Sequence, residues 1–137
     1  MTDGFTHTLS RDRQDEAGAK EGVVKQVVHQ FYGKVRRDAL LGPVFDRFIS
    51  PDEWESHLAR MCDFWSAILF QTGRYKGNPM LAHSRIDEIG PRHFDRWLEL
   101  FVETVSEECA PPLCARFTEL ALRMRENLQR ALAQVNL

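Results

Sequence analysis

Apolar residues recur every three or four positions through most of this 137-residue chain, and that spacing strongly limits how the chain can fold. Because an α-helix has 3.6 residues per turn, such spacing places the apolar side chains on one face of a helix. No segment shows the sustained alternation of apolar and polar residues that is typical of a half-buried strand. The sequence therefore predicts an all-α fold.

Four long helices and two short helical segments follow from this spacing. Proline and glycine clusters separate them, including LLGP at 40–43, TGRYKGNP at 72–79 and the proline pair at 111–112. The long helices are expected from residue 21 to about 40, over about 51–71, over about 91–109 and over about 112–134. The short segments are one turn in VFDRFI (44–49) and a short helix in MLAHSRID (80–87).

The second long helix has the best-defined start. Ser50 is expected to be its N-cap, with Pro51 at the first helical position, where a missing N–H costs nothing. Glu53 is placed to complete a capping box with Ser50, and Ile49 and Trp54 are spaced as a hydrophobic staple.

Length and charge exclude several classes of protein. The chain suggests one domain, at residues 21–137, preceded by a flexible lead-in at residues 1–20. A net charge of −2 without a basic stripe argues against nucleic acid as a partner. No apolar run approaches the ~20 residues that span a bilayer, and no signal peptide is evident, so we expect no membrane insertion and a cytoplasmic location. Three cysteines without a C-x-x-C pair fit reduced thiols, although a Cys109–Cys114 bridge is an alternative.

The residues most suggestive of function are two histidines among many aromatic rings. Aromatic residues are concentrated between positions 31 and 101, and His57 and His83 interleave with them. A haem pocket combines an apolar slot, one neutral imidazole for iron and few polar groups opposite. The alternative for His57 is a boundary histidine bonded to a backbone carbonyl, and for His83 an exposed loop histidine. His93, in the first turn of its helix, is expected to be peripheral because a cationic ring is disfavoured there.

Several segments together resemble the truncated haemoglobins, most closely their third group. The resemblance covers about residues 21–130, and both the order and the separations of the segments agree. The segments are FYGKVRRD (31–38), LLGPVF (40–45), EWESHLARMCDFW (53–65), GNPMLAHSRI (77–86) and FDRWLELFVETV (94–105).

The resemblance implies a two-over-two helical sandwich around haem b (iron protoporphyrin IX). His83 matches the proximal histidine that binds iron. Tyr32, His57 and Trp97 match residues that face a ligand on the opposite, distal side. The other expected cofactor contacts are Phe31, Phe45, Met61, Phe64, Tyr75, Met80 and Phe94.

The implied function is binding of dioxygen or another small diatomic ligand at a five-coordinate iron. Two polar donors beside such a ligand would slow its release, so redox chemistry or detoxification is expected rather than bulk transport. A second hypothesis is a haem enzyme with peroxidase-like or nitric-oxide-consuming activity. It would need an external reductase, because the sequence has no flavin or nicotinamide fingerprint. A third is a haem-free helical module that binds a partner protein.

Overall fold

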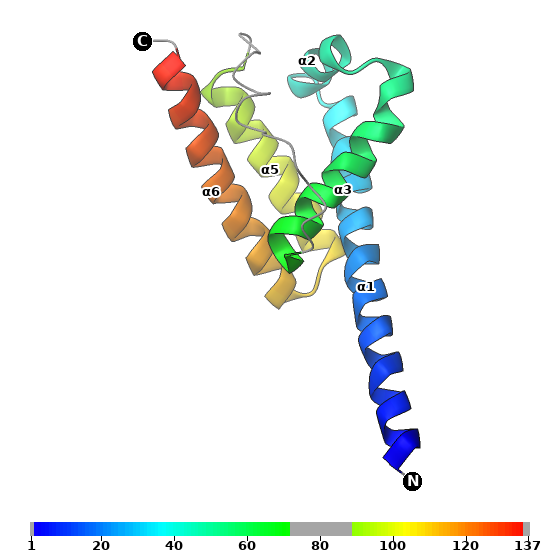
Figure 1. The fold of residues 1–137 in the computed structure, drawn as a ribbon. Coiled ribbons are helices and arrows are strands. Elements are labelled where there is room, and N and C mark those ends of the chain that lie inside the picture. The colour runs from blue at the N-terminus through cyan, green and yellow to red at the C-terminus, as the bar shows by residue number, and fades with distance from the viewer. Residues whose placement is uncertain (1, 72–88, 136–137) are drawn as a thin grey trace.

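The chain is a bundle of α-helices, seen in a computed structural model that describes the backbone of residues 2–71 and 89–135 and the side chains of 20–71 and 89–130. No strand occurs in these ranges, and the predicted all-α class is confirmed. The helical elements are α1 (Thr2–Arg37), α2 (Leu41–Phe48), a 3₁₀ turn η1 (Pro51–Glu53), α3 (Trp54–Phe70), α5 (Pro91–Glu108) and α6 (Pro111–Val135) (Figure 1).

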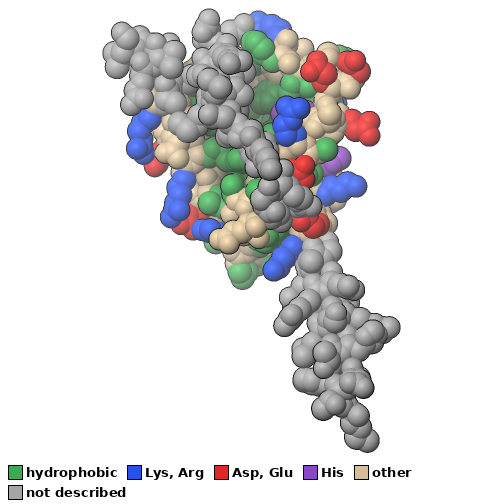
Figure 2. Space-filling model, viewed as in Figure 1, with side chains coloured by type: hydrophobic (Ala, Val, Ile, Leu, Met, Phe, Trp, Pro, Cys, Tyr) green, Lys and Arg blue, Asp and Glu red, His purple; other side chains and the backbone are tan. Residues whose placement is uncertain are grey.

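The long helices are arranged as two pairs. Helix α1 packs with α3, α5 packs with α6, and the pairs meet where α1 contacts α5 (Figure 1). The short helix α2 packs on α1 and also contacts α5. This is the two-over-two sandwich that the resemblance implied. On the face drawn in Figure 2, hydrophobic side chains gather near the middle and charged ones lie mostly toward the edges. None of the helices in the described ranges has both the length and the apolar character needed to cross a membrane.

A column of aromatic rings forms the centre of the core. Phe101 stacks between Trp65, at 4.8 Å, and Trp97, at 5.5 Å, measured between ring centroids. Phe31 meets Phe101 edge-on at 5.2 Å, and Phe117 adds a further edge contact at 6.0 Å. Burying each such side chain is worth roughly 1.5–3 kcal/mol, and ring pairs of this geometry add to that value. These contacts join α1, α3, α5 and α6.

The N-terminal region differs from the sequence-based expectation. Helix α1 begins at Thr2, whereas the apolar stripe that predicts a helix starts only near residue 21. In Figure 1 the N-terminal end of α1 extends beyond the rest of the bundle. The pattern missed this stretch because residues 1–20 have little of the apolar periodicity that marks a helix in a sequence. The division into a lead-in at 1–20 and a domain at 21–137 stays a prediction.

The start of α3 matches the sequence prediction. The backbone N–H of Ser50 donates to Glu53 Oε1 at 3.3 Å, and the capping box is complete. Its first turn, η1, is a 3₁₀ turn that leads directly into α3. The helix ends at Phe70, where Gln71 adopts a left-handed conformation with φ of 57°. The end expected near Gly73 lies outside the described residues.

Helix α2 is longer than the single turn expected at 44–49 and begins within the LLGP segment. Its close approach to the end of α1 depends on Gly42, since a Cβ there would lie 2.8 Å from the carbonyl oxygen of Arg36. The N–H of Gly42 also donates to the Asp38 carbonyl at 2.9 Å. The tight junction fixes α2 against α1.

The Asp38 carboxylate ties three helices together at this junction. It accepts hydrogen bonds from the N–H groups of Leu40, at 3.1 Å, and Leu41, at 3.0 Å, at the start of α2. The Arg96 guanidinium, on α5, donates to it at 2.7 Å. The Asp38 side chain is only 7% exposed. Burial alone would raise the pKa of Asp38, but the Leu41 N–H, Arg96 and the Leu40 N–H outweigh it and hold the pKa below its ordinary value.

Replacing Asp38 by asparagine is therefore expected to destabilise the protein in a pH-dependent way. Near pH 6 the loss should be about 1–2 kcal/mol, because asparagine loses the charge and one acceptor of the cap. The stabilisation by Asp38 is present above the unfolded pKa of about 3.9 and is lost as pH falls through the lower folded value. Urea unfolding at about pH 6 and about pH 3 gives the free energy of unfolding of wild type and D38N. The difference between the two proteins should be smaller at about pH 3. D46N, which changes an exposed carboxylate on α2, is the control. If wild type and D38N differed in free energy of unfolding by the same amount at both pH values, this interpretation would be contradicted.

The three cysteines are free thiols, as the sequence indicated. Burial, together with the nearby Cys114 and Glu108, raises the pKa of Cys109 to about 11. A thiol with so high a pKa stays protonated near neutral pH and is a weak nucleophile. No Cys109–Cys114 bridge is present.

Candidate functional site

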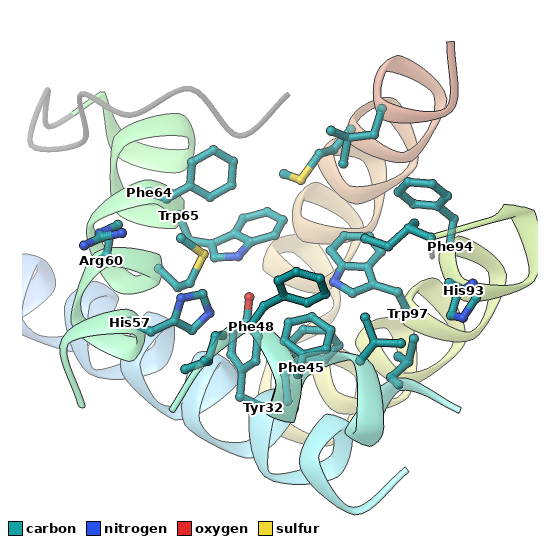
Figure 3. A pocket seen from close by; sticks show the side chains of 18 residues that line it. Tyr32, Phe45, Phe48, His57, Arg60, Phe64, Trp65, His93, Phe94 and Trp97 are labelled. Atoms are coloured by element: carbon teal, nitrogen blue, oxygen red, sulfur yellow. The ribbon is translucent and has the colours of Figure 1, made fainter. Parts of the chain in front are cut away.

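The described helices enclose a cavity of about 280 Å³ near their centre. Its volume is close to the lower end of the range of about 300–1,000 Å³ that is typical of small-molecule sites. Most of the lining is apolar or aromatic (Figure 3). The lining residues are Phe31, Tyr32, Leu41, Val44, Phe45, Phe48, Ile49, His57, Arg60, Met61, Phe64, Trp65, Ile89, His93, Phe94, Trp97, Met124 and Leu128.

Most residues predicted for the cofactor site meet in this cavity. The eight described ones, from α1, α2, α3 and α5, all line it: Phe31, Tyr32, Phe45, His57, Met61, Phe64, Phe94 and Trp97. The remaining three, Tyr75, Met80 and His83, lie outside the described residues. The expected iron ligand is therefore among the residues on which the structure is silent.

Tyr32 and His57 form the polar part of one wall. Their rings meet edge-on, with centroids 5.0 Å apart. Trp54 supports both rings, at 5.9 Å from Tyr32 and 5.5 Å from His57, and Phe45 packs on Tyr32 at 6.0 Å. Figure 3 shows the Tyr32 hydroxyl pointing into the cavity. His57 Nε2 is shielded from solvent, so the ring is turned inward, an orientation that the sequence left open.

Trp97 brings a third polar group to the cavity, from α5. Its ring stacks on Phe101 at an interplanar angle of 3° and meets Phe31 edge-on at 5.8 Å. Figure 3 shows its indole nitrogen on the cavity side. The indole N–H is a donor only. Phe101, on the same helix, and Phe31, on α1, therefore hold the indole and its donor in place.

His93 is not peripheral, and the expectation from the sequence is wrong. The residue is 8% exposed and lines the cavity. The expectation rested on a cationic ring at a helix N-terminus. Here Nδ1 instead accepts a hydrogen bond from the Gly90 N–H at 2.9 Å, which requires an unprotonated nitrogen. His93, at the third helical position, thus makes one half of a capping box at the start of α5, and the Gly90 N-cap has no side chain for the other half.

Several lining residues were missed by the sequence analysis, including Phe48 and Arg60. Phe48 is 49% exposed, which is unusual for so large an apolar side chain, and it follows Phe45 by one turn of α2. Arg60 follows His57 by one turn of α3 and brings a guanidinium to the cavity lining. The helical spacing from Phe45 and His57 is the signal that could have identified both.

The cavity suits a flat, largely apolar group such as haem. Its walls are mostly rings and aliphatic side chains, and bound haem would offer apolar surface to Phe48. Polar side chains in the lining are few: Tyr32 and His57 lie together, and Trp97, Arg60 and His93 are the others. Arginine at the lining pairs well with carboxylates such as those on the haem edge.

Comparisons with known proteins agree with this geometry. A family model described as bacterial-like globin matches residues 14–133. Among curated proteins, the chain is similar to the group 3 truncated hemoglobin ctb of Campylobacter jejuni, with 35% identity over 85 residues, or 61% of this chain and 67% of that protein. Among solved structures, it is similar to a group III truncated hemoglobin from Campylobacter jejuni. The TM-score is 0.78 at 29% identity, covering 82% of this chain and 90% of the other.

Proposed function

Because the chain belongs to the bacterial-like globin family, as a truncated haemoglobin of the third group, we propose that it binds haem b in the cavity and a small diatomic ligand beside Tyr32, His57 and Trp97. Membership of a globin family implies a haem cofactor and binding of a small ligand such as dioxygen. His83 is proposed as the one residue that would bind iron, and Tyr32, His57 and Trp97 would be available to the diatomic ligand. When bound, haem would supply an iron centre that takes this ligand and shifts negative charge onto it.

The observation that supports this proposal is the convergence of polar groups in an apolar cavity. Tyr32 on α1, His57 on α3 and Trp97 on α5 come from three helices and line the same space. A tyrosine O–H and an indole N–H are both donors. Hydrogen bonds to a charged acceptor are worth about 1.5–3 kcal/mol each. Each donor would therefore tighten ligand binding by roughly ten- to a hundred-fold.

Tight retention favours chemistry on the ligand over its transport. A carrier must release its ligand readily, whereas a protein that reduces or detoxifies a ligand needs to hold it until a reaction partner arrives. The tyrosine donor is also rigidly placed, because the Tyr32 ring is packed between Phe45, Trp54 and His57. We propose redox chemistry or detoxification, with dioxygen, nitric oxide or peroxide as reactants and an external source of electrons.

The Y32F variant tests the role of the tyrosine donor. It keeps the ring contacts and removes only the hydroxyl, so the dioxygen dissociation rate of the ferrous protein should rise by about ten-fold or more. Stopped-flow or flash-photolysis measurements give this rate. W97F should act in the same direction. F94L, which alters a cavity residue that donates no hydrogen bond, is the control and should change the rate far less. An unchanged rate in Y32F would remove the basis for slow release.

A turnover measurement separates ligand binding from enzymatic activity. If the protein consumes nitric oxide catalytically, the dioxygen-loaded protein should remove many equivalents when a reductase, reduced nicotinamide cofactor and excess dioxygen are supplied. Consumption that stops after one equivalent under the same conditions would instead identify a binding protein. Y32F provides the internal comparison, because faster loss of dioxygen should lower the turnover.

A further inference from the structure

His93 is the buried polar residue of the cavity for which the proposed ligand chemistry has no role. It lies on α5, is more than nine-tenths buried, and lines the cavity together with its neighbours Ile89 and Phe94. Its Nδ1 accepts the Gly90 N–H, so in the neutral ring the proton is on Nε2. The structure gives Nε2 no hydrogen-bond partner among the described residues. Because His93 lines the cavity, this N–H donor is available to an acceptor when the cavity is filled.

The surroundings of His93 favour an anionic acceptor. Helix N-termini carry a partial positive charge and usually have acidic residues in their first turn. The first turn of α5 has none, and Arg92 adds a positive charge there. The nearest acidic residue along the helix, Asp95, is paired with Arg125 of α6. The positive end of an 18-residue helix and the Nε2–H donor are therefore both available to a negative group in the cavity.

We propose that His93 Nε2 donates a hydrogen bond to a carboxylate of the bound cofactor, so that the start of α5 anchors one haem propionate. This inference rests on the proposed function, because it requires haem in the cavity. It assigns His93 two contacts through its two nitrogens. Nδ1 caps the helix and fixes the ring, and Nε2 holds the cofactor.

Two nearly isosteric substitutions separate these contacts. Glutamine and glutamate both suit the third position of a capping box, because a side-chain oxygen of either accepts the Gly90 N–H. H93Q keeps an N–H donor for the propionate, whereas H93E replaces it with a negative charge. Hemin dissociation, followed by transfer to an excess of a haem scavenger, should be about ten-fold or more faster in H93E than in wild type. In H93Q it should stay within about three-fold of the wild-type rate.

Hemin dimethyl ester identifies the cofactor group involved. Esterification removes the negative charge of both propionates, so the difference between H93E and H93Q should largely disappear with this cofactor. Thermal unfolding of the hemin-free proteins controls for a purely structural effect and should give similar midpoints for the two variants. A difference that persists with the ester would overturn the propionate contact.

The outcomes also separate this inference from the proposed function. A Soret band in wild type and both variants, with equal hemin dissociation rates, would overturn the role of His93 and leave the haem site intact. Absence of a Soret band in wild type would overturn both. Faster release in H93E alone, abolished by the ester, is the result we expect.

Discussion

The edge-on contact of Phe31 with the rings of α5 determines how the rest of the molecule is built. Phe31 is 2% exposed and meets Phe101 at 5.2 Å and Trp97 at 5.8 Å. It joins the α1–α3 pair to the α5–α6 pair at the level of the cavity. The next residue, Tyr32, is rotated by about 100° around the helix and faces the cavity. The contact that closes the core therefore also positions the tyrosine donor.

The cavity combines two requirements that usually oppose each other. A flat apolar cofactor needs apolar walls, whereas polar groups in such walls are costly to bury without partners, by roughly 1–3 kcal/mol each. Here the polar groups are few, and their rings are held by aromatic neighbours. Trp97 stacks on Phe101, and His57 is braced by Trp54. Donors fixed in this way need little rearrangement when they meet a ligand, which is the physical basis for the slow ligand release that we propose.

Much of the fold and of the site was predictable because local patterns determined it. The apolar stripes located the long helices, and the Ser50–Glu53 capping box defined the start of α3. The family resemblance named Phe45, Phe64 and Phe94 as cofactor contacts, and all three line the cavity. The pairing of the helices also came from the family resemblance, since a stripe shows which face is buried and not against which helix.

The failures of prediction have physical causes of their own. His93 was expected at the periphery because its charge was assumed, whereas its Nδ1 accepts the Gly90 N–H and the ring is buried. Phe48 and the extent of α2 depend on the Asp38 and Gly42 junction, which joins α1, α2 and α5 and has no signature in any one segment. The onset of α1 at Thr2 was missed because the stripe begins later.

The most direct test of this account is the absorption spectrum of the purified protein titrated with hemin, for wild type and for H83A. We predict a strong Soret band in wild type that saturates at one hemin per chain, and a lost or shifted band in H83A. A matched H29A variant, which changes an exposed histidine on α1, should leave the spectrum unchanged. Absence of a Soret band at any hemin concentration would contradict the account and would favour a haem-free helical module that binds a partner protein.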